Sequence, residues 1–113
     1  MPPQHDRRDS PEYALARIKE LAAAESVSLT GRSTTDSQDL GYSFEEVCRC
    51  IAELEPQDFD HSVRYESNWF WLDVYKMRNQ TSRRRIDDLY IKIRLNRDCI
   101  LVTVHSFHTE LYL

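Results

Sequence analysis

Six side chains in the second half of this chain can move protons and hold a phosphate. Histidine has a free pKa near ~6.5, so it can accept or donate a proton at neutral pH. Lysine and arginine bind phosphate oxygens through charge-assisted hydrogen bonds. The six residues are His61, Tyr90, Lys92, Arg94, His105 and His108. The same residue types also cover the solvated face of an ordinary sheet, so their arrangement matters more than their presence.

The spacing of these residues predicts which of them share a face. Tyr90, Lys92 and Arg94 alternate with three aliphatic residues, which is typical of a strand with one buried and one polar side. His105 falls on the polar face of the next strand. His108 has the opposite parity, so it can join that face only past a bulge or a strand end.

The second half of the chain is expected to form a mainly antiparallel sheet. Its apolar residues alternate with period two, and the turn 96–98 closes a hairpin. The expected strands cover about 61–66, 69–77, 87–95 and 99–107. We expect the three aromatic residues Trp69, Phe70 and Trp71 to lie mostly in the core. Leu72 has the same parity as Phe70 and Val74, so we expect it to be a packing residue. The loop 78–85 is polar and basic; its Arg83, Arg84 and Arg85 form either a solvated loop or a clamp on a nucleic-acid backbone.

The first half is expected to be helical. Ser10 as N-cap and Pro11 at the first helical position predict a helix over about 11–24. Residues 27–30 are typical of a short strand, and 33–40 of a short helix or loop that Gly41 ends. Ser43 and Glu46 form a capping box before a second helix over about 44–53. Helices followed by a meander indicate an α+β fold.

Composition and length favour one water-soluble domain. The chain has 113 residues, of which 41% are hydrophobic and 30% charged. Residues 1–10 offer nothing to bury and are expected to form a disordered tail before a single domain over 11–113. They lack the apolar segment of a signal peptide, and no run is long enough to span a membrane, so a cytoplasmic protein is expected. Cys48 and Cys50 point about 200° apart on a helix, which favours buried, reduced thiols over a shared metal or disulfide.

Charge is distributed unevenly between the two halves. The net charge of −4 by itself argues against nucleic-acid binding. Residues 1–60 carry six Lys and Arg against thirteen Asp and Glu, whereas residues 61–113 carry nine against six. The helical half is therefore acidic and the strand-rich half basic, which softens that argument.

Most of the chain, from about residue 13 to 105, resembles the MqsR family of bacterial toxins. Each matching piece is ordinary by itself, but their order and spacing together are fairly specific. The matching pieces are 16–21 (ARIKEL), 40–44 (LGYSF), Cys48, 58–59 (DF), 71–75 (WLDVY), 89–93 (LYIKI) and 98–102 (DCILV). The resemblance implies a RelE-like ribonuclease-toxin fold. It also implies an endoribonuclease that cuts mRNA at GC-containing triplets without a metal or other cofactor, and an MqsA-like antitoxin as partner.

The resemblance also implies where the site lies. The family has a lysine, a glutamine, a tyrosine and a C-terminal lysine there, and this chain has His61, Leu72 and Tyr90 at the first three positions. The last lysine aligns with His105 if no residue is inserted. With two or three inserted residues, His108 matches it better, because Ser106 and Phe107 precede it as in the family's Ser-Phe-Lys.

These substitutions suggest a two-histidine mechanism. Cutting RNA without a metal needs a base for the 2′-hydroxyl proton, an acid for the leaving 5′ oxygen, and a cation near the phosphate. Our hypothesis is that His61 and His105 form the base–acid pair, and that Tyr90 orients the RNA or donates a proton to it. Lys92 and Arg94 then hold the phosphate.

Two other readings remain open. A chain without the family's lysines and glutamine can be a catalytically degraded member that only binds an antitoxin or RNA as a regulator. It can also be a toxin that cuts only ribosome-bound mRNA. The toxin alone is expected to be a monomer or a weak dimer.

Overall fold

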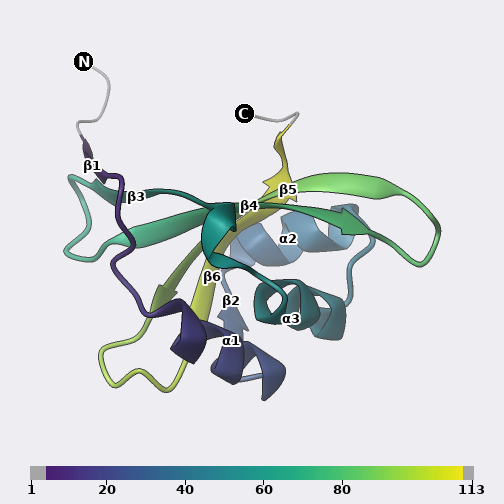
Figure 1. Cartoon of the computed structure of the whole chain (residues 1–113), viewed down its shortest axis with the longest axis horizontal. Helices are drawn as coiled ribbons and strands as arrows, with labels where there is room; N and C mark the ends of the chain where they lie inside the picture. The colour runs from purple at the N-terminus through teal and green to yellow at the C-terminus, as the bar shows by residue number, and fades with distance from the viewer. Residues whose placement is uncertain (1–4, 111–113) are drawn as a thin grey trace.

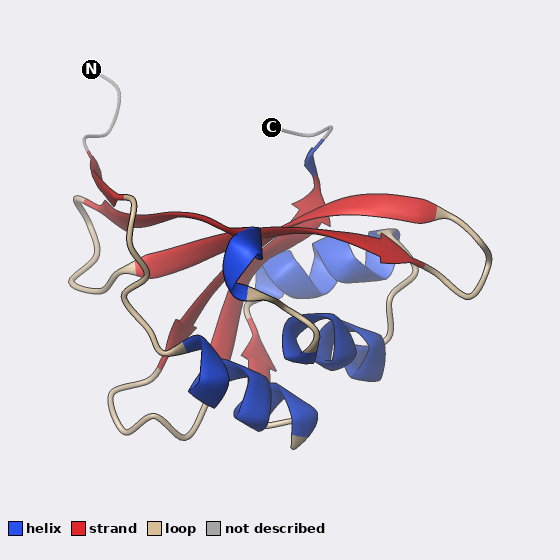
Figure 2. Ribbon diagram, in the orientation of Figure 1, coloured by secondary structure: helices blue, strands red, loops and turns tan. Residues whose placement is uncertain are grey.

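The computed structural model describes residues 5–110 (Figures 1 and 2). Within this range a six-stranded sheet has the order β1-β3-β4-β5-β6-β2, antiparallel throughout except for the parallel pair of β2 and β6. The strands are β1 His5–Arg8, β2 Val27–Leu29, β3 Phe59–Tyr65, β4 Leu72–Gln80, β5 Ile86–Leu95 and β6 Val102–Thr109. Three α-helices are described as well: α1 Leu15–Ala23, α2 Gly31–Asp39 and α3 Phe44–Ala52, with a 3-10 turn η1 Pro56–Asp58. The expected α+β fold is confirmed.

The three helices lie on one side of the sheet and leave the other side open (Figure 2). The main core fills the space between α1, α3 and the inward residues of β5 and β6, where Ile91, Ile93 and Val104 are fully buried. Among the described residues, Val63, Leu72 and Val74 form a small buried apolar cluster on the open side. The prediction of one buried and one polar face is confirmed, as is the packing of Leu72. None of the described helices is long and apolar enough to cross a membrane.

Helix α3 forms as its sequence predicts. The Ser43 hydroxyl accepts from the Glu46 N–H, and the Glu46 carboxylate accepts from the Ser43 N–H, so the capping box is present. Cys48 and Cys50 are both buried and free, as expected, although they lie on different sides of the helix. Burial raises the pKa of Cys48 to about 11 and that of Cys50 to about 12, so both thiols stay protonated.

Helix α1 begins four residues later than expected. Its N-cap is Ala14, so Ser10 and Pro11 precede the helix. The reason is the buried carboxylate of Asp73 on β4, which accepts hydrogen bonds from the backbone N–H groups of Glu12 and Tyr13 at 3.0 Å and 2.9 Å. This tertiary contact replaces the helical turn that the local sequence favours.

Residues 5–8 form a strand, whereas the sequence predicted a disordered tail over residues 1–10. This strand, β1, pairs antiparallel with β3 from His5 opposite Tyr65 to Arg8 opposite Ser62. Two side-chain contacts stabilise this pairing of β1. Arg64 donates a hydrogen bond to the Asp6 carboxylate, and the Arg8 guanidinium lies 3.8 Å from the Trp71 ring centroid. The part of the predicted tail at residues 1–4 lies outside the described residues.

Strand boundaries differ most at β4. It begins at Leu72 rather than at Trp69 and continues to Gln80, so the basic loop shortens to residues 81–85. Trp69 therefore lies in the β3–β4 connection with 70% of its surface exposed, and its expected burial is wrong. The smaller elements agree with the sequence: β2 forms over Val27–Leu29, α2 forms over Gly31–Asp39, and Gly41 adopts a φ of +83°.

Candidate functional site

The open side of the sheet carries most of the predicted site residues. Tyr90, Lys92 and Arg94 project from β5 onto this side, as their spacing predicts. The β4–β5 register places Lys76 opposite Tyr90 and Val74 opposite Lys92. Since Val74 belongs to the apolar cluster of the open side, the register independently places Lys92 there.

A bulge in β6 brings His108 onto the same side. Lys92 pairs with Ser106 but the next residue, Ile93, pairs with Val104, so the register of β5 and β6 leaves His105 as the extra residue. Beyond the bulge His108 lies opposite Tyr90. The two rings stack with centroids 5.0 Å apart and planes 9° from parallel. The bulge therefore reverses the parity that otherwise turns His108 away from the site.

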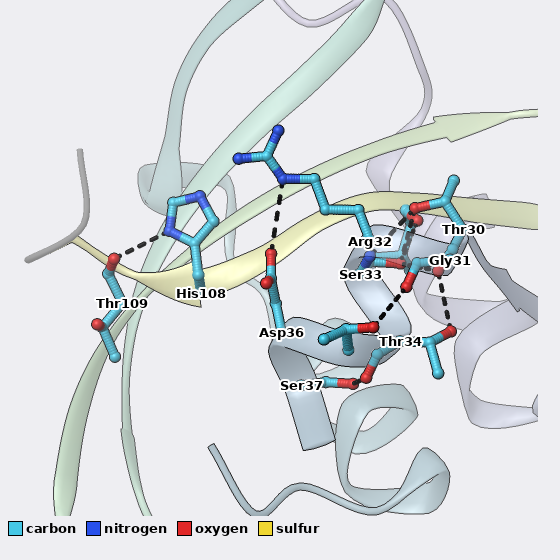
Figure 3. A network of polar contacts seen from close by, with 11 residues as sticks. Thr30, Gly31, Arg32, Ser33, Thr34, Asp36, Ser37, His108 and Thr109 are labelled. Carbon is cyan, nitrogen blue, oxygen red and sulfur yellow. Dashed lines mark hydrogen bonds and ion pairs between the residues drawn. The ribbon is translucent and has the colours of Figure 1, made fainter. Parts of the chain in front are cut away.

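A contact with the backbone sets the state of the His108 ring. Nδ1 lies 2.9 Å from the carbonyl oxygen of Thr109, which can only accept, so Nδ1 carries the proton of this bond (Figure 3). In the neutral ring, Nε2 then has the free lone pair. His108 also borders a pocket of about 320 Å³ whose other wall belongs to α2, where Arg32 pairs with Asp36 (Figure 3).

His105 is tied to Arg94 instead of facing Tyr90. The Arg94 Nε donates to His105 Nε2 at 3.2 Å, and the Phe70 ring centroid lies 5.6 Å from that of His105. Burial lowers the pKa of His105, and the charges of Arg94 and Lys92 lower it further. The His105 ring is therefore neutral at pH 7, with Nε2 already accepting a hydrogen bond.

Lys92 lies near the centre of the open side. Its Nζ donates to the Tyr65 hydroxyl at 2.6 Å and lies 5.8 Å from the centroid of the Tyr90 ring. Burial raises the pKa of Tyr90, and the nearby Tyr65 and Asp60 raise it further. The phenol of Tyr90 is thus a neutral hydrogen-bond donor close to a fixed ammonium group.

His61 lies on β3 and is hydrogen-bonded to the carboxylate of Asp60. A bulge between Phe59 and His61 places Asp60 beside the His61 ring, and Nδ1 lies 2.6 Å from the Asp60 carboxylate. Lys76 lies 3.6 Å from the other Asp60 oxygen. The hydrogen bond from His61 holds the pKa of Asp60 below its usual value, and the Lys76 charge adds to this. Asp60 is therefore ionised at pH 7 and orients the ring.

The structure brings only some of the predicted residues together. Tyr90, Lys92 and His108 are close neighbours, whereas His61 on β3 and His105 on β6 are three strand spacings of about 4.8 Å apart. That separation is too large for the proposed pair to face each other across one phosphate. The arginines of the basic loop lie at the tip of the β4–β5 hairpin (Figure 1). There Arg85 bonds to the buried Asp87 and to the Leu40 carbonyl, which is a structural role.

Sequence reasoning missed three neighbours of the site. Asp60, Tyr65 and Lys76 each contact or adjoin a predicted residue, as described above. Lys76 has the same parity as Val74, but only the β4–β5 register shows that it lies opposite Tyr90. Asp60 precedes His61 directly in the chain, and this adjacency was the one signal that the sequence offered.

Comparison with known proteins decides the family. A family model described as "Motility quorum-sensing regulator, toxin of MqsA" matches residues 10–109. The chain belongs to the MqsR toxin family. An MqsR of Escherichia coli (strain K12), named as an mRNA interferase toxin, is 30% identical over 95 residues, which cover 83% of this chain and 92% of that protein. The resemblance to MqsR is thereby confirmed, and this chain is a toxin of a toxin–antitoxin system.

Proposed function

We propose that this MqsR-family toxin is an mRNA interferase, an endoribonuclease that needs no metal and that an MqsA-like antitoxin inhibits. The name of the E. coli relative supports the activity, and the family description supports the partner. The observation that carries the proposal is the stacked pair of Tyr90 and His108 beside Lys92 on the open side of the sheet. Cleavage at short GC-containing sequences stays a prediction from the resemblance.

The arrangement suggests the following roles. His108 accepts the 2′-hydroxyl proton at Nε2, because Nδ1 is held by the Thr109 carbonyl. The 2′ oxygen then forms a bond to phosphorus while the bond from phosphorus to the 5′ oxygen breaks. Tyr90, protonated at neutral pH, donates a proton to the leaving 5′ oxygen. The products are a 2′,3′-cyclic phosphate and a 5′-hydroxyl end.

Positive charge around this pair stabilises the transition state. Lys92 lies between the Tyr65 and Tyr90 rings, where its ammonium can contact a non-bridging phosphate oxygen. His61, oriented by Asp60 on β3, lies two strands from Lys92 and binds a neighbouring part of the RNA. Arg94 and His105 bind the backbone further along β5. This assignment replaces the pair of His61 and His105 by His108 as base and Tyr90 as acid, because Arg94 already occupies the Nε2 of His105.

The test is cleavage of a naked, end-labelled RNA that contains every triplet, with EDTA present. We expect cuts at a small set of sequences and products with 2′,3′-cyclic phosphate ends. An MqsA-like antitoxin added in equimolar amount should suppress them. If the folded protein leaves naked RNA intact but cuts translated messages, the ribosome-dependent reading holds. If neither RNA is cut and expression is harmless to cells, the chain is a binding protein.

A further inference from the structure

Trp69 is an exposed aromatic residue that the proposed reaction does not use. It lies in the connection between β3 and β4 with 70% of its surface exposed. Phe70 follows it, and their rings meet edge to face with centroids 5.4 Å apart and planes at 88°. Trp69 presents a large area for stacking to solvent and loses little side-chain entropy on binding, while the half-buried Phe70 ring supports it.

Two guanidinium groups accompany this aromatic pair. The Arg94 guanidinium carbon lies 4.4 Å from the Phe70 ring centroid, and that of Arg97 lies 5.8 Å from the Trp69 ring centroid. All four residues line one pocket of about 250 Å³. The acidic residue of this pocket, Glu12, forms an ion pair with Arg8, so its charge is already compensated. The pocket therefore combines flat rings with cations.

The pocket lies further along β5 from the proposed cleavage site, where Arg94 lines it. Arg94 follows Lys92 by two residues on the same side of β5 and bonds to His105 on β6. Tyr90 and Arg94 are four residues apart, which is about 13 Å along a strand. An RNA strand whose scissile phosphate lies at Tyr90 and Lys92 can thus reach the pocket only with a neighbouring nucleotide.

We propose that Trp69 and Phe70, flanked by Arg94 and Arg97, form a platform on which nucleobases of single-stranded RNA next to the cut stack. Stacking on aromatic rings beside a positive groove is how proteins hold single strands without reading their sequence. The inference rests on the proposed function and adds to it a binding site outside the catalytic pair. Two guanidinium groups over the rings favour a nucleic acid over an apolar protein segment as the occupant.

Binding of a strand that cannot be cut tests the platform apart from catalysis. The probe is a fluorescein-labelled 2′-O-methyl oligonucleotide of mixed sequence, which lacks the 2′-hydroxyl nucleophile, measured by anisotropy with the wild-type protein. We expect Trp69→Ala to weaken its binding by about 5- to 150-fold and Trp69→Phe to restore most of it. Arg94→Gln and Arg97→Gln should each weaken binding and reduce its salt dependence.

Ile86→Ala is the matched control. Ile86 is also a large exposed apolar side chain, 59% exposed, but it lies at the start of β5 near the hairpin tip. Its loss should leave RNA binding unchanged. Equal RNA affinity of Trp69→Ala and wild type would overturn the platform, and a loss of affinity for an MqsA-like antitoxin alone would identify a protein-docking surface. No binding of the oligonucleotide by the wild type would overturn the proposed function as well.

Discussion

The ring of His108 lies parallel to the ring of Tyr90, with centroids 5.0 Å apart. This contact depends on one extra residue in β6, because without the bulge at His105 the His108 side chain would turn toward the helices. Two histidines three residues apart in β6 therefore have different environments. His108 faces Tyr90 and keeps a free ring nitrogen, whereas His105 accepts a hydrogen bond from Arg94.

Replacing Tyr90 by Phe tests the role of its hydroxyl without removing the stack. The ring stays against His108, so binding should change little, while loss of the proton donor should slow cleavage about 100-fold. The measurement is the single-turnover rate on a short RNA together with its dissociation constant. A rate equal to that of the wild type would show that Tyr90 only supports the ring of His108.

The environment of His105 predicts a pH dependence of stability. Its pKa in the folded protein is lowered by burial and by the Arg94 and Lys92 charges, whereas the unfolded chain has an ordinary pKa near ~6.5. As the pH falls below that value, the unfolded state binds more protons, so the free energy of unfolding decreases. Above about pH 6.5 this contribution to the pH dependence vanishes.

Urea unfolding of His105→Gln at pH 7.5 and pH 5.5 measures this effect. Glutamine can still accept from Arg94 but does not titrate, so the variant should lose less stability over this range, by up to about 1.4 kcal/mol per pH unit. His5→Gln, at an exposed position on β1, is the control. An identical pH dependence of His105→Gln and wild type would contradict the inferred direction of the shift.

Asp73 is expected to be the most sensitive acidic position for stability. Its buried carboxylate accepts from the N–H groups of Glu12 and Tyr13 and so fixes the entry into α1. Asp73→Ala leaves these donors without their acceptor and should lower the free energy of unfolding by about 2 to 4 kcal/mol. Asp88→Ala removes an exposed carboxylate that pairs with Arg78 at the surface, and it should cost much less. Similar midpoints of urea unfolding for the two variants would be the contrary result.

The sequence was sufficient where local patterns decide the structure. The capping box of Ser43 and Glu46, the alternation of Tyr90, Lys92 and Arg94, and the end of α2 at Gly41 all depend on near neighbours in the chain. These features need no knowledge of the tertiary fold.

Long-range contacts account for the errors. The hydrogen bonds to Asp73 make α1 begin later than the local sequence predicts. Pairing with β3 turns residues 5–8, which were expected to form a tail, into a strand. Asp73 and β3 are both far away in the sequence from the residues that they contact. Which of His105 and His108 lies beside Tyr90 depends on the bulge in β6, and no residue type at this position predicts a bulge. The separation of His61 from His105 could not be predicted for another reason, since parity places residues on a face but does not say how many strands lie between them.

The most direct test of the account compares His108→Ala and His105→Ala in single-turnover cleavage of naked RNA with EDTA present. Both variants should be checked for native unfolding midpoints first. We predict that His108→Ala loses activity by at least about 100-fold, whereas His105→Ala keeps the chemical step and binds RNA more weakly. Full cleavage activity in a folded His108→Ala protein would contradict the assignment of Tyr90 and His108 as the catalytic pair.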